Sequence, residues 1–269
     1  MAWYGEARRS LLVMAAIGTA MLGSGVAEAK PTAQKARAAT QGQINVVYNR
    51  VRSPLAKDFQ TVFQKSRLFE TAVAPINQNI LLPRDLTVEL GECGFVNAFY
   101  EPGAHRIVMC YELIDHLTKV FRKSGMGQRD AEVQALNAAV FTFYHELAHM
   151  LIHEMDLPIV GKEEDVADQF SALLLSNAGD GGKGAILAAA QWFGSSQSPE
   201  SREKYMDEHS LNEQRAYYLI CLLHAQSPGE LSGLVKRLGF PPERLQKCKD
   251  EYRQIARSWE MMITPFLRR

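Results

Sequence analysis

The spacing of apolar residues divides the chain into two parts. Between residues 44 and 110, short β-rich runs are bounded by turn residues, which is typical of strands. After residue 110, apolar residues recur three and four positions apart, as in helices that bury one face. The predicted strands cover residues 44–51, 86–90, 95–100 and 106–109, with a turn at residues 101–104.

Helices are predicted from capping residues and from the same spacing. Ser53 and Pro54 provide an N-cap and a first-turn proline for a helix that runs to about Phe69. The longest predicted helix covers residues 128–155, and the next covers residues 163–176, where Asn177, Ala178 and a run of glycines stop it. The other predicted helices cover residues 112–123 and the C-terminal part, which loops at 194–199, 227–229 and 239–242 divide.

Strands come before most of the helices, without the strand-helix alternation of an α/β protein. This order favours the α+β class. The 269 residues are 46% hydrophobic, which is enough for a sizeable core. No linker-like segment divides residues 44–269. We therefore predict one catalytic domain over these residues, with a small mixed sheet and a mostly helical C-terminal half.

The N-terminus has the pattern of a secretory signal peptide over residues 1–29. Arg8 and Arg9 precede an apolar run, and Ala27 and Ala29 supply small residues at the cleavage positions. The alternative is an uncleaved anchor, but the run is short for a membrane span and contains glycines. We expect an exported protein, periplasmic or secreted, without a membrane anchor after cleavage. Residues 30–43 are predicted to be a flexible lead-in.

Charge and cysteine content narrow the function classes. The formal net charge is zero, so nothing indicates binding to nucleic acid. The four cysteines all follow the predicted cleavage site, and their even number suits two disulfides in an oxidising compartment. Four cysteines allow three pairings. The alternatives to disulfides are free buried thiols and a zinc cluster, and the absence of a C-x-x-C spacing argues against the cluster. We favour Cys93–Cys110 and Cys221–Cys248, because each pair lies within one supersecondary unit.

A His-Glu-x-x-His motif lies in the longest predicted helix. His145 and His149 are four residues apart, so their imidazoles project from one face and can bind the same zinc ion. Glu146 lies beside them, where it can act as a general base on a water at the metal. The alternative is a surface helix with unrelated histidines, but the flanking residues are apolar. His153 extends the row and is interpreted as a flanking histidine.

A third protein ligand is expected, because catalytic zinc keeps one position for water. Glu164 and Asp168 are also four residues apart, at the start of the next predicted helix. We predict that Glu164 binds the metal and that Asp168 accepts a hydrogen bond from the free N–H of a ligand histidine. Glu163 or Asp165 is the alternative ligand, although neither has an acidic residue four positions later.

These residues resemble the gluzincin branch of zinc peptidases, which includes thermolysin and neprilysin. Residues 97–100, Asn-Ala-Phe-Tyr, are similar to the edge strand that holds the substrate backbone in that branch. The following strand, residues 106–109, also fits the layout of neprilysin. Asp207, His209 and Arg215 resemble neprilysin's Asp-x-His and downstream Arg. The overall similarity is greatest to a bacterial family of putative metallopeptidases and extends from about Val46 to the end.

The resemblance implies a zincin-like fold, one zinc ion and a peptide or protein substrate. It implies that Asn97 and Ala98 align the substrate, that His209 stabilises the oxyanion and that Arg215 engages the substrate. Asp207 would orient His209. The spacing of the ligands is shorter than in thermolysin or neprilysin, and neprilysin's large capping domain is absent. Substrate size and specificity therefore cannot be carried over.

The sequence thus predicts a zinc metallopeptidase in which Glu146 acts as general base on a zinc-activated water. Two alternatives stay open. One is a non-catalytic exported binding protein that keeps the fold and holds a structural zinc in a closed site. The other is a metal-dependent amidase that acts on non-protein amides, as in cell-wall processing.

Overall fold

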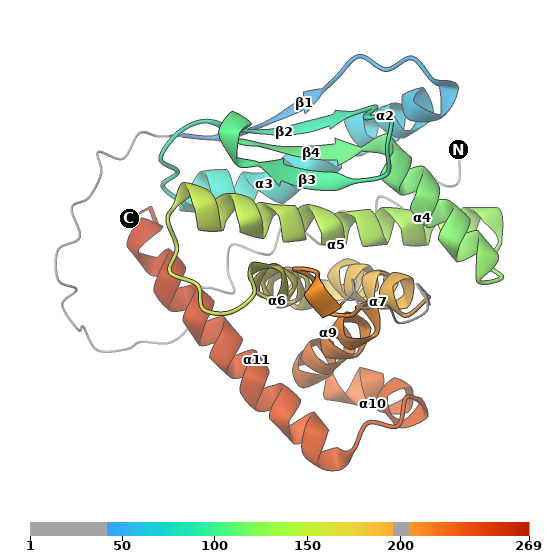
Figure 1. Cartoon of the computed structure of the whole chain (residues 1–269), viewed down its shortest axis with the longest axis vertical. Coiled ribbons are helices and arrows are strands. Elements are labelled where there is room, and N and C mark those ends of the chain that lie inside the picture. Colours follow the sequence, from blue (N-terminus) through green and yellow to red (C-terminus); the bar gives the residue numbers. More distant parts are fainter. Residues whose placement is uncertain (1–41, 196–204, 269) are drawn as a thin grey trace.

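The computed structural model describes residues 42–195 and 205–268. The predicted signal peptide (1–29), most of the predicted lead-in (30–43) and part of the predicted loop 194–199 lie outside the described residues. The predicted α+β class is confirmed: a small mixed sheet is followed by a mostly helical C-terminal half (Figure 1).

The sheet has four strands in the order β1-β2-β4-β3. The strands β1 (Ile44–Tyr48), β2 (Leu86–Gly91) and β4 (Arg106–Cys110) are parallel, and β3 (Ala98–Glu101) runs antiparallel to β4. The sheet is therefore mixed, as predicted, and β3 is one of its two edges.

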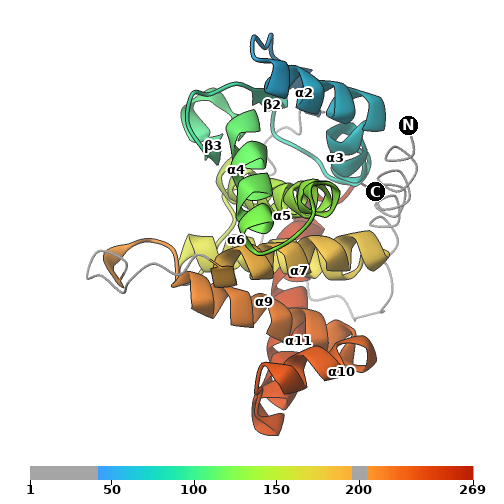
Figure 2. The same cartoon turned by 90° about the vertical axis from the view of Figure 1, so that its right-hand side faces the viewer.

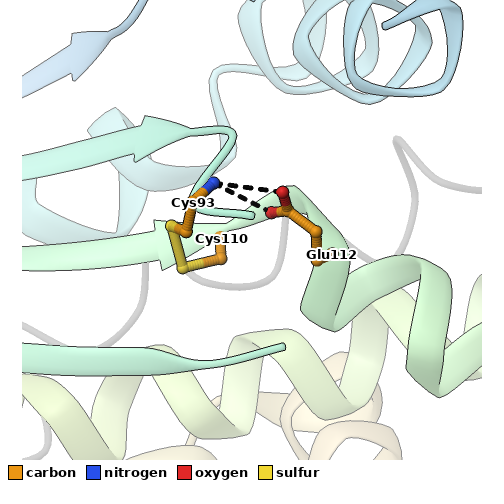
Figure 3. Close-up of side chains that lie close together, drawn as sticks. All are labelled: Cys93, Cys110 and Glu112. Carbon is orange, nitrogen blue, oxygen red and sulfur yellow. Dashed lines mark hydrogen bonds between the residues drawn. A yellow bond between two sulfur atoms is a disulfide. The ribbon is translucent and has the colours of Figure 1, made fainter. Parts of the chain in front are cut away.

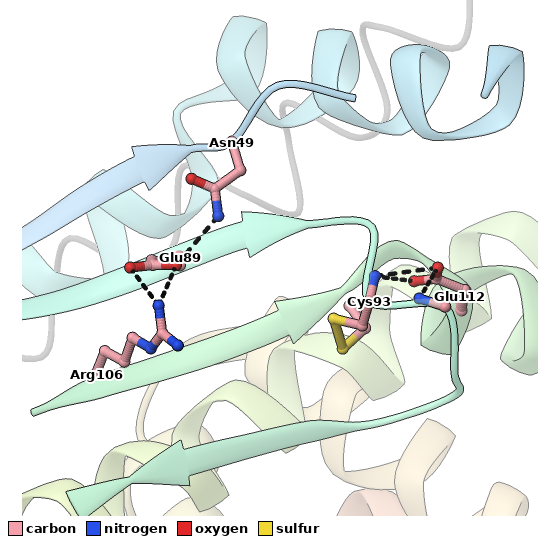
Figure 4. Close-up of a disulfide and its surroundings, with 7 residues drawn as sticks. Asn49, Glu89, Cys93, Arg106 and Glu112 are labelled. Atoms are coloured by element: carbon pink, nitrogen blue, oxygen red, sulfur yellow. Dashed lines mark hydrogen bonds and ion pairs between the residues drawn. A yellow bond between two sulfur atoms is a disulfide. The ribbon is translucent and has the colours of Figure 1, made fainter. Parts of the chain in front are cut away.

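Two predicted strands, residues 44–51 and 95–100, are shorter in the structure, where β1 ends at Tyr48 and β3 begins at Ala98. After β1, the side-chain amide of Asn49 donates a hydrogen bond to Glu89 of β2, and the chain leaves the sheet towards α2 (Figure 4). The segment before β3 is fastened by the Cys93–Cys110 disulfide, and Gly94 has a φ of 81°. Residues 95–97 therefore form a loop, and β3 begins only at Ala98.

The predicted helix at residues 54–69 is two helices in the structure, α2 (Pro54–Ser66) and α3 (Leu68–Asn79). Ser53 caps α2 as predicted, since its hydroxyl accepts a hydrogen bond from the backbone N–H of Ala56. The break lies at Arg67, whose φ is 53°. A left-handed residue ends one helix and redirects the chain, and no Pro or Gly marks this position in the sequence.

The helix α5 (Gln128–Glu154) is the central element of the fold. It contacts β3 and β4 on one side, and it contacts α4 (Tyr111–Lys123), α6 (Glu163–Ser176) and α7 (Gly179–Ser195) on the others. In Figure 1, α5 runs beneath the sheet, with α6 and α7 below it. Surrounded in this way, α5 is buried on nearly all sides after Ala138, rather than on the single face that its sequence pattern predicted.

The predicted stop after α6 is confirmed, since α6 ends at Ser176 and Gly179 has a φ of 67°. The glycines that follow lie at the beginning of α7. The reason is close packing between successive helices. A Cβ on Gly182 would lie 2.0 Å from the carbonyl oxygen of Leu175 and 2.8 Å from the Cβ of Ala178. Only a glycine allows the two backbones to approach so closely.

The helices α9 (Asn212–Gln226), α10 (Pro228–Arg237) and α11 (Pro242–Ile263) complete the C-terminal half. Figure 2 shows the resulting layers, from α2, α3 and the sheet through α5 to α6 and α7, and then to α9, α10 and α11. No helix in the described part of the chain is long and apolar enough to cross a membrane.

Each half of the fold contains one of the two predicted disulfides. Cys93–Cys110 joins the loop before β3 to the end of β4, with a Cα–Cα distance of 5.5 Å (Figure 3). Cys221–Cys248 joins α9 to α11, with a Cα–Cα distance of 5.3 Å. The described residues contain no free cysteine.

Candidate metal centre

Helix α5 presents the two motif histidines to one point. The Nε2 atoms of His145 and His149 are 3.2 Å apart. Two nitrogens that bind one tetrahedral zinc ion at 2.0–2.1 Å lie about 3.3 Å apart, so the observed separation fits a shared zinc ion. His145 is only 5% exposed, because α5 is enclosed by its neighbours.

Glu164, in the first turn of α6, brings a carboxylate to the same point. One of its oxygens lies 2.9 Å from Nε2 of His145, and the other lies 3.5 Å from Nε2 of His149. Burial alone would raise the pKa of Glu164, but hydrogen bonds from the surrounding histidines outweigh burial and hold it far below its usual range. Two imidazoles and one carboxylate form a donor set that suits zinc.

His209 approaches the same carboxylate from the segment before α9. Its Nε2 lies 2.9 Å from a Glu164 oxygen, and His145, Glu164 and His209 have donor atoms close enough to share one ion. The backbone N–H and the Nδ1 of His209 both bond Asp207, at 2.8 and 2.9 Å. The structure thus brings His209 and Asp207 to the centre. It leaves His209 in a position that suits either a hydrogen-bond donor or a fourth ligand.

Asp168 lies behind the centre, one helical turn after Glu164. It is 3% exposed, and its Oδ1 lies 2.9 Å from Nδ1 of His145. Arg215 of α9 donates to both oxygens of Asp168, at 2.7 and 2.9 Å. Burial would raise the pKa of Asp168, but the Arg215 and His145 contacts lower it. Burial acts to lower the pKa of His145, but its hydrogen bonds with Asp168 and Glu164 outweigh burial and raise this pKa to about 9.

Arg215 has a different environment from the one that the sequence resemblance suggests. Its guanidinium pairs with Asp168 and lies 4.0 Å from the ring centroid of Phe193. Arg215 also lines the cavity at the centre. The structure therefore shows it as the partner of Asp168, and its contact with substrate stays a prediction.

Glu163 is a residue of the site that sequence reasoning weighed only as an alternative ligand. Its Oε1 lies 2.7 Å from Nδ1 of His149 and 3.1 Å from Nε2 of His153. Each motif histidine thus has its own carboxylate behind it, Asp168 for His145 and Glu163 for His149. Glu163 opens α6, but no acidic partner four residues later singles it out. His153 contacts Glu163 and the ring of Tyr100, and it lies beside the centre.

Glu146 lines the cavity together with the ligand histidines and also contacts the sheet. It is 7% exposed, and one of its oxygens accepts a hydrogen bond from the backbone N–H of Tyr100, at 2.9 Å. Burial raises the pKa of Glu146, although His145, His149 and this hydrogen bond act to lower it. A carboxylate with a raised pKa is a better proton acceptor than a solvated one. The contact of Tyr100 with Glu146 was not foreseen, since it depends on how β3 packs against α5.

The edge strand β3 passes directly in front of the centre. Asn97, Ala98 and Tyr100 all line the cavity. The carbonyl of Asn97 accepts a hydrogen bond from the N–H of Cys110 in β4, whereas the N–H of Tyr100 points away from β4 to Glu146. Backbone groups alternate in direction along an antiparallel strand, so those of Ala98 point to the open edge as well. This arrangement is compatible with an added peptide strand.

The cavity has a volume of about 620 Å³. Its polar side contains the predicted ligands, Glu146 and His209. Its apolar side is contributed by α4, α5 and α7, and the residues there are Leu113, Phe141, Trp192 and Phe193.

A family model described as "putative metallopeptidase" matches residues 48–263. No curated protein and no solved structure matches the chain. The matched stretch begins at the last residue of β1 and ends at the last residue of α11, so it includes every residue of the candidate centre.

Proposed function

Because the chain belongs to the putative metallopeptidase family, we propose that it is a gluzincin-like zinc peptidase with His145, His149 and Glu164 as metal ligands. The observation that carries the proposal is the geometry of these three side chains, whose nearest donor atoms are 2.9 to 3.5 Å apart. Zinc supplies a Lewis acid and an acidified water in sites of this kind.

Glu146 is proposed as the general base and then as the acid towards the leaving amine. Its carboxylate is buried beside the two ligand histidines, and burial raises its pKa. The N–H of Tyr100 holds one oxygen, so the other is free to take and return a proton. His209, oriented by Asp207, would donate a hydrogen bond to the developing oxyanion. The open edge at Ala98 would align the peptide backbone, with Asn97 beside it.

Replacement of Glu146 by Gln tests the role of the base. We expect zinc content to stay at the wild-type level and turnover of a mixed peptide library to fall by about 10² to 10⁴-fold, the range of general acid-base catalysis. Glu132→Gln is the matched control, because Glu132 lies on the same helix, where its carboxylate accepts a hydrogen bond from Gln128. A Glu146→Gln variant with bound zinc and full activity would disprove the assignment.

A second candidate function is a non-catalytic protein with a closed zinc site, and the position of His209 favours it specifically. With His209 as fourth ligand, no position for water would remain. His209→Ala separates the two functions. The peptidase proposal predicts retained zinc and about 10²-fold lower turnover, as for loss of an oxyanion donor. The closed-site proposal predicts weaker zinc binding, and no hydrolysis of peptides or other amides by the wild type.

We also propose that the protein is exported after removal of residues 1–29, to the periplasm or outside a bacterial cell. The two disulfides support this proposal, because such bonds form in oxidising compartments. N-terminal sequencing of the mature protein from an expressing cell tests it, and an intact N-terminus in the cytoplasm would contradict it.

A further inference from the structure

The strand β3 contributes two groups to the proposed active site, but few backbone hydrogen bonds hold the strand in place. It is four residues long and pairs with β4 alone among the described strands. Yet its backbone holds Glu146 at Tyr100 and faces the cavity at Ala98. Short edge strands are marginally stable without further support. The position of β3 therefore depends on contacts outside the ladder.

At the entry to β3, the support comes from Glu112 in the first turn of α4. Its carboxylate accepts hydrogen bonds from the backbone N–H of Cys93, 3.1 Å from each oxygen (Figure 3). It also accepts one from the N–H of Gly94, at 2.7 Å. The Cys93–Cys110 disulfide joins the same loop to β4. Asn97, the first cavity residue of this segment, follows three residues after Gly94.

At the exit from β3, the support comes from Glu154 at the end of α5. The hydroxyl of Tyr100 donates a hydrogen bond to Glu154, at 2.7 Å, and Arg84 and His105 contact the same carboxylate. Glu154 is only 4% exposed, and a buried carboxylate is strongly destabilising unless it is paired. Tyr100 is thus tied to α5 at two points, by its backbone at Glu146 and by its side chain at Glu154.

We propose that Glu112 and Glu154 are positioning residues for the two ends of β3, which Glu112 holds to α4 and Glu154 holds to the active-site helix α5. This inference rests on the proposed function. Glu112 acts on the substrate-aligning end, at Asn97 and Ala98, so its loss should mainly raise KM. Glu154 acts through Tyr100 on Glu146, so its loss should mainly lower kcat. Neither residue contacts the metal ligands, so zinc content should not change.

Removal of the Tyr100 hydroxyl tests the exit end. Tyr100→Phe keeps the ring and the backbone N–H, so we expect kcat to fall about tenfold, as for loss of one hydrogen bond to a charged group, with KM changed less than about twofold. Glu154→Gln keeps an acceptor for the hydroxyl and should retain most of kcat. Tyr218→Phe, which loses a hydroxyl bonded to Gln169, is the control. Wild-type kcat in Tyr100→Phe would overturn this end of the proposal.

Removal of the Glu112 carboxylate tests the entry end. In Glu112→Ala, we expect KM to rise about fivefold or more and kcat to stay within about twofold, since two backbone N–H groups lose their acceptor. Glu230→Ala is the control, because Glu230 also lies in a first helical turn, that of α10, but far from the cavity lining. An unchanged KM, or an equal rise in the control, would overturn this end.

Amide hydrogen exchange at β3 makes the test independent of peptidase activity. The amides of Ala98 to Glu101 should exchange faster in Tyr100→Phe and Glu112→Ala than in the wild type and both controls. An inactive wild type would disprove the proposed function, while exchange would still decide how β3 is held. Unchanged exchange in both variants would overturn the inference, whatever the activity.

Discussion

The ligand side and the substrate side of the candidate centre are built differently. His145, Glu164 and Asp168 lie on two adjacent helices, and their side chains are 7, 18 and 3% exposed. His209 and Asp207 precede α9 and are 39 and 51% exposed. The helices place the first group through the packed core, whereas the second group is held by a few polar contacts. Lys162 bonds two carbonyls of this segment, and Ser210 bonds Asp165.

The buried side suits tight binding of the metal, and the exposed side suits contact with the substrate. Ligands in a packed region need no reorganisation to bind an ion, which favours tight binding. Groups that meet the substrate must stay accessible. Substitutions on the ligand side should therefore have the largest effects and should act on zinc binding. Those on the substrate side should be smaller and act on turnover.

The largest effect is expected for Glu164→Gln, which removes the only predicted carboxylate ligand. Loss of a hydrogen-bond partner of a metal ligand costs up to about 10²-fold in affinity, so loss of a ligand itself should cost more. Peptidase activity should be lost together with the zinc. Competition with a chromophoric chelator measures the affinity. Asp165→Asn, the next residue, should leave zinc affinity unchanged. Wild-type affinity in Glu164→Gln would show that another residue is the third ligand.

Asp168→Asn should lower zinc affinity about 10 to 100-fold, because a neutral amide is a weaker acceptor for the His145 ring than the carboxylate that it replaces. The variant should also be destabilised by about 3 kcal/mol or more, since Arg215 keeps a buried charge without its partner. Chelator competition and chemical denaturation measure the two effects separately. An effect on stability alone would mean that Asp168 serves the fold and not the metal.

Glu163→Gln should have a smaller effect of the same kind, about tenfold in zinc affinity, at the low end for a partner of a ligand histidine. Glu163 is 30% exposed, so water can replace part of its hydrogen bond to His149. The same chelator competition applies, with Asp165→Asn again as control. An effect on zinc affinity equal to that of Asp168→Asn would show that burial of the carboxylate does not decide how much it contributes to zinc binding.

The smallest effect is expected for Ser210→Ala on the substrate side. Loss of the hydrogen bond from Ser210 to Asp165 should lower kcat/KM about threefold and leave zinc content unchanged, since a neutral donor contributes little net energy. Ser232→Ala, whose hydroxyl bonds a backbone carbonyl within α10, is the control. A loss of zinc in Ser210→Ala would show that this segment belongs to the metal side.

Much of the fold was predictable because the relevant signals are local. The 3.6-residue spacing gave α5 and α6 to within a residue, and the even cysteine count led to the two disulfides that the structure contains. Errors occurred where no local signal exists. Arg67, for example, turns left-handed between α2 and α3, where one helix was predicted.

The candidate site shows the same limit. The His-Glu-x-x-His spacing on one helix placed His145 and His149 together, because four residues make about one turn. The contacts of Glu163 with His149 and of Tyr100 with Glu146 were not foreseen. Both depend on the distance and rotation between two packed elements, and a spacing within one element does not contain this information.

The sequence by itself therefore determined the fold class and the residue types of the proposed metal ligands. Both follow from the kinds of residue that lie a few positions apart in the chain. Only the tertiary structure decided how these groups are held. In the folded chain, Arg215 pairs with Asp168, His209 lies beside Glu164, and the open edge of β3 faces Glu146. Such contacts join residues 45 or more positions apart in the chain, and only the packing of helices and sheet around α5 brings them together.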